Sequence, residues 1–253
     1  MERLLDATAR AEQRHFWFRG LRRFVRPLIA GAVAGHADPQ ILDCGCGTGA
    51  NLAVLGEYGD ARGIDREWAG VRRAQAAGRR VSQANVTHLP FADARFHLVT
   101  SFDVLYSLPD ADERAAVSEM FRVLRPGGRV IVNVAAMPIL TGNHSVLAHE
   151  VRRYRASDLR SALERGGFHV DRITYTNTAM LPILVPLRLL QRRLGLARED
   201  EEDATRELRV PSWPVNMVLD RVLALEAALV RHVVLPCGSS LLAVASKPDA
   251  DPR

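Results

Sequence analysis

The segment whose residue types and spacing are best suited to bind a reactive ligand is a glycine-rich loop that follows a short apolar run. Asp43 lies near the end of the run Ile41–Cys44, and glycine then occupies every second position up to Gly49, where a helical stretch begins. Glycines at such positions allow a tight turn and let a ligand lie against the main chain, where a Cβ atom would intrude. The sequence therefore predicts that one edge of a cofactor lies against this loop.

Two carboxylates narrow the kind of cofactor that this loop would hold. Asp43 precedes the glycines, where it would repel a pyrophosphate in a partly dry cleft but suits a ligand that carries an ammonium group. Asp65 follows 22 positions later at the end of the next apolar run, where a carboxylate can accept hydrogen bonds from both ribose hydroxyls. The alternative is a nicotinamide cofactor, because Gly45-x-Gly47-x-x-Ala50 also satisfies a loose dinucleotide fingerprint.

The elements that must position these residues alternate between short β-type runs and helical stretches from Ile41 onward. This alternation is typical of a parallel sheet whose strands are joined by crossover helices, so it predicts an α/β fold. The predicted strands are Ile41–Cys44, Ala61–Ile64, Val81–Ala84, His97–Ser101, Arg129–Val134, Phe168–Tyr175 and Ser240–Ala245. The predicted helices are Asn51–Glu57, Arg66–Ala77, Asp110–Leu124 and Ser157–Arg165.

Glycine pairs predict two of the element boundaries. Arg125–Gly128 should stop a helix, since Pro126 cannot continue it and glycine accepts a left-handed cap, and a strand should begin at once. The pair Gly166–Gly167 should end a helix that Ser157 or Asp158 begins as its N-cap.

Four segments resemble, in order and spacing, the motifs of the class I S-adenosylmethionine-dependent methyltransferases of types 11 and 12. They are the glycine loop Asp43–Gly49, the ribose-binding segment Gly63–Asp65, the adenine-surrounding segment Asn85–Phe91 and the Leu-x-Pro-Gly-Gly turn Leu124–Gly128. The resemblance covers about Gln40 to Ala135. It implies S-adenosyl-L-methionine as cofactor and a Rossmann-like, doubly wound, mostly parallel seven-stranded sheet with an antiparallel last strand.

The resemblance also implies which residues of these segments bind the cofactor. They are Asp43, Gly45, Cys46, Gly47, Gly49, Asn51, Asp65, Arg66, Asn85 and Val86. Asn85 replaces a usual aspartate, so its oxygen can accept from the adenine amino group only without charge assistance, which predicts modestly weaker binding. His97 replaces another usual aspartate, and we interpret it as unrelated to catalysis. Cys44 and Cys46 lack a second ligand pair at a usable spacing, so we expect packing beneath the cofactor and no metal.

The exit of the fourth predicted strand supplies further candidates, because the carboxyl ends of parallel strands face the ligand crevice. We expect the backbone of Ser101 and Phe102 to approach the methionine part of the cofactor and Tyr106 to face its methyl group. The alternative is that Phe102 and Leu105 are plain core residues.

An aromatic segment, Arg14–Gly20, precedes the predicted sheet and resembles an element found before the fold in some methyltransferases of this group. We interpret it as a flap in which Trp17 covers the cofactor and Arg19 binds the cofactor carboxylate through a charge-assisted hydrogen bond. The alternative is an aromatic core cluster.

Methyl transfer from a sulfonium depends mainly on positioning, but an acceptor that reacts through a hydroxyl or an acidic carbon also needs a base. His144 and His149 are the candidates, in a stretch that resembles a His-x-Arg-Arg-Tyr element of related small-molecule methyltransferases but is one residue longer. Arg153 and Tyr154 would position an anionic or hydroxylated acceptor. The alternative is a capped surface turn that leads into the helix at Ser157.

The chain is expected to form one domain, with a helical insertion before its last strand. The predicted parts are a helical flap (1–38), a Rossmann-like core (39–178), a helical insertion or cap (179–238), the last strand (239–248) and a tail (249–253). The insertion combines a proline-interrupted apolar helix near Ala179–Leu190, a charged stretch (198–203) and an amphipathic helix from about Pro214 to Arg231. We expect its helices to cover the sheet edge or the active site.

The composition favours a globular protein with a small-molecule or lipid-like acceptor. The 34 basic and 29 acidic residues give a net charge of +5, but the arginines are spread throughout, which argues against a nucleic-acid partner. Three cysteines and the lack of a signal-like segment predict a cytoplasmic protein, and no stretch is long enough to span a membrane.

The expected function is methylation of a small or lipid-linked metabolite, by a monomer or a homodimer. Arg188, Arg192 and Arg193 beside apolar residues allow shallow docking at an anionic membrane, although core packing of that helix is the alternative. A nicotinamide-dependent oxidoreductase and a cofactor-binding regulator without catalysis are the other hypotheses. The sequence leaves open whether oxygen, nitrogen or carbon receives the methyl group.

Overall fold

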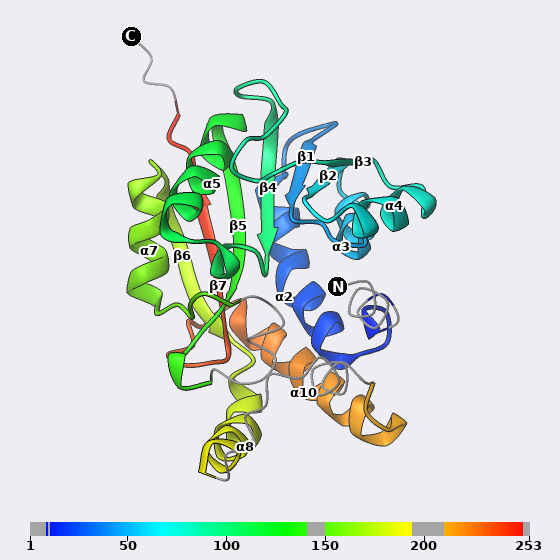
Figure 1. The fold of residues 1–253 in the computed structure, drawn as a ribbon, viewed down its shortest axis with the longest axis vertical. Helices are drawn as coiled ribbons and strands as arrows, with labels where there is room; N and C mark the ends of the chain where they lie inside the picture. Colours follow the sequence, from blue (N-terminus) through cyan, green and yellow to red (C-terminus); the bar gives the residue numbers. More distant parts are fainter. Residues whose placement is uncertain (1–8, 10, 141–149, 194–209, 250–253) are drawn as a thin grey trace.

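The computed structural model describes residues 9, 11–140, 150–193 and 210–249, and within them the chain forms one seven-stranded sheet (Figure 1). The strands are β1 (Gln40–Cys44), β2 (Asp60–Asp65), β3 (Val81–Gln83), β4 (Phe96–Phe102), β5 (Leu124–Ala135), β6 (His169–Thr176) and β7 (Ser240–Ser246). Their order is β3-β2-β1-β4-β5-β7-β6, and β7 runs antiparallel to both of its neighbours. The predicted Rossmann-like class with an antiparallel last strand is thus confirmed.

Helices cover both faces of the sheet, which is why its central strands are apolar on both sides. The helices are α2 (Phe16–Ala32), α3 (Ala50–Leu55), α4 (Trp68–Ala76), α5 (Asp110–Val123), α7 (Ala156–Arg165), α8 (Leu181–Arg193) and α10 (Trp213–Val230). Three short 3₁₀ helices are η1 (Leu105–Ser107), η2 (Pro138–Leu140) and η3 (Thr178–Met180). Side chains of α5 and α7 complete the core on one face, and those of α2, α3, α4 and α10 complete the core on the other.

Strand alternation sends neighbouring residues of β1 to opposite cores. Leu42 and Cys44 belong to the core under α5 and α7, whereas Ile41 belongs to the core under α2 and α10. All seven residues of β4 are buried, as expected for a strand in the middle of a parallel sheet. The period of two therefore also fixes which polar side chains near the carboxyl ends share a face.

Two predicted element boundaries need correction. Helix α5 ends at Val123 and β5 begins directly at Leu124, so no glycine caps this helix. Gly127 does adopt a left-handed conformation, with φ of +72°, but its N–H donates to the carbonyl of Lys247 beyond the last strand. Its conformation therefore serves a contact between distant parts of the chain.

The start of α7 also differs from the prediction. The N-cap is Arg155 rather than Ser157 or Asp158, and the Asp158 carboxylate accepts a hydrogen bond from the Arg155 N–H at 3.2 Å. Asp158 therefore caps the helix from its third position. Gly166 and Gly167 end the helix as predicted.

The N-terminal helix packs on a helix of the late insertion. Arg23 of α2 forms two hydrogen bonds of 2.5 and 2.9 Å with the carboxylate of Asp220 in α10, which is 5% exposed. The side chain of Asn216 accepts from the Phe16 N–H at 3.0 Å and donates to the Arg14 carbonyl at 2.9 Å. Figure 1 shows α2 and α10 meeting beyond the tips of β4 and β5. Two segments about 200 positions apart therefore form one layer.

None of the helices in the described ranges combines the length and apolarity that crossing a membrane requires.

Candidate functional site

The glycine loop leaves the carboxyl end of β1 and leads into α3. Gly45, Gly47 and Gly49 all have positive φ values, of 81°, 52° and 80°. A Cβ atom on Gly45 would lie 2.2 Å from the Cγ2 of Val104, so no side chain fits there. A Cβ atom on Gly47 would have no neighbour within 4 Å, which leaves this part of the main chain open for a ligand to approach.

Asp65 holds the loop in place from the carboxyl end of β2. Its carboxylate oxygens accept hydrogen bonds from the Gly47 N–H at 2.7 Å and the Glu67 N–H at 2.8 Å. Each oxygen has a further lone pair, so the same carboxylate can still accept hydroxyl protons from a ribose. The Arg66 side chain is 76% exposed and lies 3.6 Å from the Glu67 carboxylate.

Asp43 is a buried carboxylate whose hydrogen bonding is incomplete. Its side chain is 1% exposed, and one of its oxygens accepts a hydrogen bond from the Thr100 hydroxyl at 2.7 Å. The other oxygen, Oδ2, is buried and has no partner. Burial raises the pKa of Asp43 to about 7, against the lowering effect of the Thr100 hydrogen bond, and the nearby Asp65 raises it further. A ligand ammonium group would supply both the missing donor and the compensating charge.

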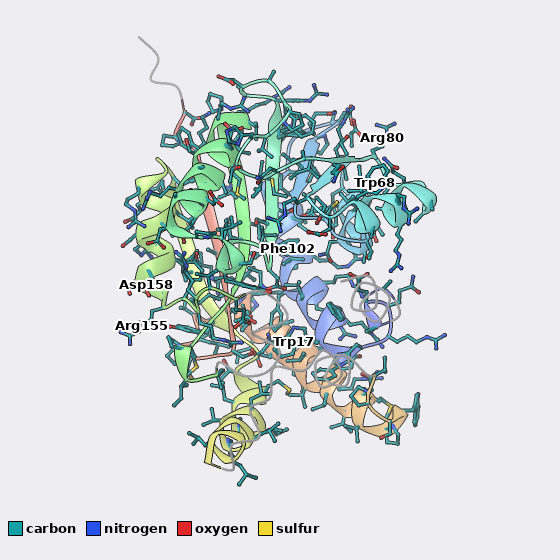
Figure 2. The ribbon with its side chains drawn as sticks, viewed as in Figure 1. Trp17, Trp68, Arg80, Phe102, Arg155 and Asp158 are labelled. Atoms are coloured by element: carbon teal, nitrogen blue, oxygen red, sulfur yellow. The ribbon has the colours of Figure 1, made fainter. Side chains whose placement is uncertain are left out.

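The N-terminal segment touches the glycine loop directly. The Thr48 hydroxyl donates a hydrogen bond to the Glu12 carboxylate, a contact between two residues that the sequence did not single out. His15 caps α2, because its Nδ1 accepts from the Trp17 N–H at 3.2 Å. In Figure 2, Trp17 lies beyond the tip of β4, the tip that Phe102 marks. The segment therefore lies beside the glycine loop, and its role as a flap stays a prediction.

A second polar pair lies at the ends of β4 and β5, and the sequence prediction missed it. Asp103 follows β4 and is solvent-exposed, and its carboxylate accepts a hydrogen bond from the Asn133 Nδ2 at 2.9 Å. Asn133 is 4% exposed and its Oδ1 has no partner. One amide in the otherwise apolar run Val130–Ala135 was the signal that could have identified it.

Comparison with known proteins agrees with this arrangement. Residues 42–132 match the family model of a methyltransferase domain. The segment includes the glycine loop, Asp65 and Asp103, and it ends one residue before Asn133. Over these residues the chain carries a methyltransferase domain of the class I S-adenosylmethionine-dependent kind.

Individual members of this methyltransferase class are similar over part of their length. A probable S-adenosylmethionine-dependent methyltransferase of Mycolicibacterium smegmatis is 32% identical over 166 residues, which cover 63% of this chain and 62% of that protein. The O-methyltransferase cnsE of Penicillium expansum is 31% identical over 151 residues, 53% of this chain and 54% of that protein. The chain therefore spans between about half and two thirds of these relatives.

Solved structures share the fold. The crystal structure of the YcgJ protein from Bacillus subtilis has a TM-score of 0.58 at 16% identity, and the match covers 89% of this chain and 98% of that one. A sarcosine dimethylglycine methyltransferase structure from Galdieria sulphuraria also gives a TM-score of 0.58 at 16% identity, covering 90% and 86%. At such identities the likeness concerns the fold alone.

The described residues fit the cofactor of this methyltransferase class, S-adenosylmethionine. The unpartnered Oδ2 of Asp43 suits its ammonium group, the open main chain at Gly47 suits close approach, and Asp65 suits its ribose. Cys44 and Cys46 are buried thiols beside the loop, and burial raises the pKa of both. Across the described ranges, no cluster of three His, Cys, Asp or Glu side chains could hold a metal ion.

Several predicted cofactor residues make local contacts of their own. The Asn85 oxygen accepts a hydrogen bond from the Thr87 N–H at 3.1 Å, so adenine would share this oxygen with the turn. Arg19 lies 3.1 Å from the Asp220 carboxylate in α10, on the layer formed by the two helices. Ser101 and Phe102 are buried, and Phe102 is part of the core under α2. Val86 is buried in the other core, and Asn51 lies in the first turn of α3.

The two tyrosines predicted near the acceptor are both buried. Tyr106 in η1 is 7% exposed, and burial raises its pKa far above the usual value. Tyr154 is 2% exposed, and its hydroxyl donates to the carboxylate of Glu113 in α5. Burial and that bond raise the Tyr154 pKa as well. Both phenols therefore stay protonated near neutral pH and can act as hydrogen-bond donors rather than as bases.

The predicted bases His144 and His149 lie outside the described residues, and their roles stay predictions. Arg153, from the same stretch, forms two hydrogen bonds of 2.9 Å with Glu150 and a third of 3.1 Å with the Ala136 carbonyl. This ion pair is almost fully buried, with side chains 11% and 5% exposed. The charges of Glu150 and Arg153 both act on Asp103, so the stretch reaches the exit of β4.

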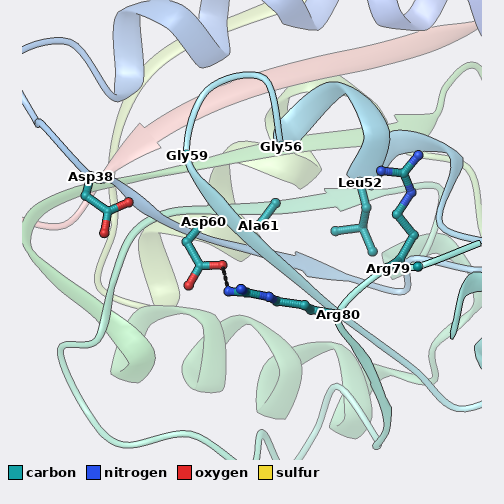
Figure 3. Close-up of a pocket in the computed structure, with 9 residues that line it drawn as sticks. Asp38, Leu52, Gly56, Gly59, Asp60, Ala61, Arg79 and Arg80 are labelled. Atoms are coloured by element: carbon teal, nitrogen blue, oxygen red, sulfur yellow. Dashed lines mark hydrogen bonds and ion pairs between the residues drawn. The ribbon is translucent and has the colours of Figure 1, made fainter.

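A cavity of about 480 Å³ lies at the other edge of the sheet (Figure 3). Asp38, Asp60 and Arg80 line it, and Arg80 lies 2.6 Å from the Asp60 carboxylate. These residues precede β1, begin β2 and precede β3, so the cavity faces the amino ends of the strands. Ligands of parallel sheets bind at the carboxyl ends. This cavity is therefore not the cofactor site.

Proposed function

We propose that the chain transfers the methyl group of S-adenosylmethionine to a small-molecule or lipid-like acceptor. The observation that carries the proposal is the buried carboxylate of Asp43, with its unpartnered Oδ2, beside an open glycine loop. A buried carboxylate oxygen without a donor is costly, so its presence at the end of β1 calls for a cationic group of a ligand.

The bound cofactor supplies an activated methyl group, and the residues of the chain position the reactants around it. Asp43 binds the ammonium group, while Asp65 binds the ribose and keeps the glycine loop in register through Gly47. The N-terminal segment, anchored to the loop by Glu12 and Thr48, excludes water from the reaction space. Such positioning accounts for much of the acceleration of an in-line displacement.

The names of relatives support a small-molecule acceptor. One relative is the ubiquinone/menaquinone biosynthesis C-methyltransferase UbiE of Photorhabdus laumondii, 26% identical over 197 residues, which cover 62% of this chain and 76% of that protein. Another, 29% identical over 171 residues, is the O-methyltransferase resE of Aspergillus sclerotiorum.

Exposed apolar side chains on the insertion helices support a lipid-like acceptor. Ile183 and Leu190 of α8 are 57% and 54% exposed, and Trp213 and Leu225 of α10 are 75% and 73% exposed. An apolar acceptor, or the membrane that contains it, would cover such side chains favourably.

The experiment is a pair of measurements on the purified chain. Isothermal titration with S-adenosylhomocysteine and, separately, with NAD and NADP should give binding of the first ligand alone. Incubation with methyl-labelled S-adenosylmethionine and quinol, phenol and amine acceptors should then give a labelled product. Binding without any transfer would favour a cofactor-binding regulator, and binding of NAD or NADP would favour an oxidoreductase.

A further inference from the structure

The polar pair Asp103 and Asn133 is held in a strained and specific geometry. Asp103 has a φ of +61°, a left-handed conformation that residues other than glycine rarely adopt. Its N–H donates to the Asn133 carbonyl at 2.9 Å, and its carboxylate accepts from the Asn133 side chain at 2.9 Å. Two hydrogen bonds to one residue therefore fix both the main chain and the side chain of Asp103. Strain of this kind is concentrated at functional sites.

The side-chain oxygen of Asn133, which does not bond to Asp103, indicates that a ligand binds here. Its side chain is 4% exposed, its Nδ2 donates to Asp103, and its Oδ1 has no donor. An unpaired amide oxygen in a buried side chain costs roughly 1–3 kcal/mol. A hydrogen-bond donor on a bound molecule would remove this cost.

The strand register places this pair next to the cofactor residues. Thr100 of β4 pairs with Asp43 of β1, and Phe102, two positions further along β4, pairs with Asn133 of β5. Asp43 and Asn133 therefore share one face of the sheet on either side of β4. Asp103 follows Phe102 directly, at the carboxyl end of β4.

Several neighbouring groups set the pKa of the Asp103 carboxyl group. Asp103 is exposed to solvent as a residue, yet desolvation of its carboxyl group by the surrounding protein, the largest cause, raises its pKa to about 6. The hydrogen bond from Asn133 lowers the pKa, the negative charge of Glu150 raises it, and the positive charge of Arg153 lowers it. Tyr106 of η1 is the other titratable group beside it among the described residues, and it is protonated. Asp103 is thus ionised at neutral pH and more basic than an ordinary aspartate.

We propose that Asp103 is the base that takes the proton of a hydroxyl group on the acceptor, and that Asn133 is the residue that positions this carboxylate. The inference rests on the proposed function and assigns its acceptor class, a hydroxyl compound methylated on oxygen. The acceptor oxygen forms a bond to the methyl carbon while the bond from sulfur to that carbon breaks. The hydroxyl proton passes to the Asp103 carboxylate, and the sulfonium becomes a neutral thioether.

The charges around Asp103 favour a hydroxyl over other nucleophiles. A carboxylate acceptor would bring a third negative charge beside Asp103 and Glu150, which costs free energy at short distances. A protonated amine would be attracted, but it has no lone pair with which to attack the methyl group. A hydroxyl is neutral, donates a hydrogen bond to Asp103 and keeps a lone pair for the methyl carbon.

The test compares wild-type protein with Asp103→Asn, Asn133→Ala and the control Asp112→Asn, an exposed aspartate on α5. Carboxyl carbon NMR of aspartate-labelled protein should show a resonance that titrates near pH 6 and is missing in Asp103→Asn. In Asn133→Ala this titration should move to higher pH, because the hydrogen bond that lowers the pKa is gone. A merely structural Asn133 would leave the titration unchanged.

Binding and transfer are then measured with p-cresol, 4-methylbenzylamine and 4-methylbenzoate. p-Cresol should bind to protein saturated with S-adenosylhomocysteine, and Asp103→Asn should weaken this binding about tenfold. With labelled S-adenosylmethionine, p-cresol should receive the label, and Asp103→Asn should slow the transfer at least ~100-fold. The transfer rate of the wild type should rise as the pH increases through about 6, and Asp103→Asn should not show this rise. Asp112→Asn should behave as wild type.

Three results would overturn the assignment of Asp103. In the first, the Asp103 carboxyl group titrates near pH 4. In the second, p-cresol fails to bind to wild-type protein or binds equally well to Asp103→Asn. In the third, only the amine or only the carboxylate receives the label. In each case wild-type protein and Asp103→Asn would still bind S-adenosylhomocysteine equally well. Loss of that binding in wild-type protein would instead contradict the proposed function, so the two failures are distinguishable.

Discussion

The hydroxyl of Thr100 in β4 donates a hydrogen bond of 2.7 Å to the carboxylate of Asp43 in β1. This bond satisfies one oxygen of a carboxylate that is buried beside the glycine loop, while Oδ2 has no partner. It also orients the carboxylate, so that the free oxygen has a fixed position. The protein therefore maintains a costly group in a defined geometry, as expected where a cationic ligand binds.

Cofactor affinity should depend on pH through Asp43. Its pKa of about 7 means that the carboxylate is largely protonated below pH 6 and ionised above pH 8 in the free protein. Because the ionised form binds the ammonium group, affinity for S-adenosylhomocysteine should rise about tenfold between pH 6 and pH 8. Calorimetric titration across this range measures it, and Asp38→Asn, at the opposite edge of the sheet, should leave the pH dependence intact.

Replacing the buried carboxylate should stabilise the free protein while weakening cofactor binding at least tenfold. The folded-state pKa of Asp43, about 7, lies above the usual 3.8, so wild-type protein loses stability as pH rises from about 4 to 7. Asp43→Asn keeps an acceptor for Thr100 and avoids this loss. Urea unfolding without ligand should show a gain on the order of 4 kcal/mol at pH 8 that vanishes near pH 4. A variant less stable than wild type at pH 8 would contradict this account.

Two glycines of the loop should respond differently to alanine. Gly45→Ala places a methyl group 2.2 Å from Val104, so it should reduce both stability and cofactor binding. The new Cβ atom of Gly47→Ala meets no protein atom within 4 Å, so backbone strain of roughly 1–2 kcal/mol should be its only structural cost. Cofactor binding should nevertheless weaken at least tenfold, because the methyl group occupies the space that the ligand needs. Gly35→Ala, with φ of +84° and equally open space, is the matched control for strain. Equal affinities for Gly47→Ala and Gly35→Ala would show that no ligand approaches Gly47.

The contact between α2 and α10 should support cofactor binding from a distance. Asp220→Ala removes the carboxylate shared by Arg19 and Arg23, which should cost about 1–3 kcal/mol in free energy of unfolding. It should also weaken binding of S-adenosylhomocysteine, because α2 follows the segment that joins Glu12 to Thr48 of the loop. Glu57→Ala breaks the exposed pair with Arg26 and should cost under about 1 kcal/mol. Unchanged affinity of Asp220→Ala for S-adenosylhomocysteine would show that the contact between α2 and α10 does not support cofactor binding.

Local patterns in the sequence were sufficient for most of the fold. Hydrophobic runs and turn residues located all seven strands to within a few residues, since the period of each run is a local property. The start of β5 at Leu124 was missed because it depends on pairing with β4, and the role of Gly127 depends on Lys247, 120 positions away. Such contacts leave no local pattern.

The same distinction holds at the site. The glycine loop and Asp65 could be predicted, because their spacing carries the motif. Thr100 could not, because its partner Asp43 faces it only through the register of neighbouring strands. The amide of Asn133 stands out in an apolar run, but its partner Asp103 could not be inferred from it. The ion pair of Arg19 with Asp220 could not be predicted either, because Asp220 lies in a helix 201 positions later in the sequence.

The most direct test of the central claim is calorimetric titration of S-adenosylhomocysteine into wild-type protein and Asp43→Asn at pH 8. The account predicts one site per chain in the wild type, at least tenfold weaker binding in the variant, and proton release when the wild type is titrated at pH 7. An absence of binding by the wild type, or equal affinity in the two proteins, would contradict it.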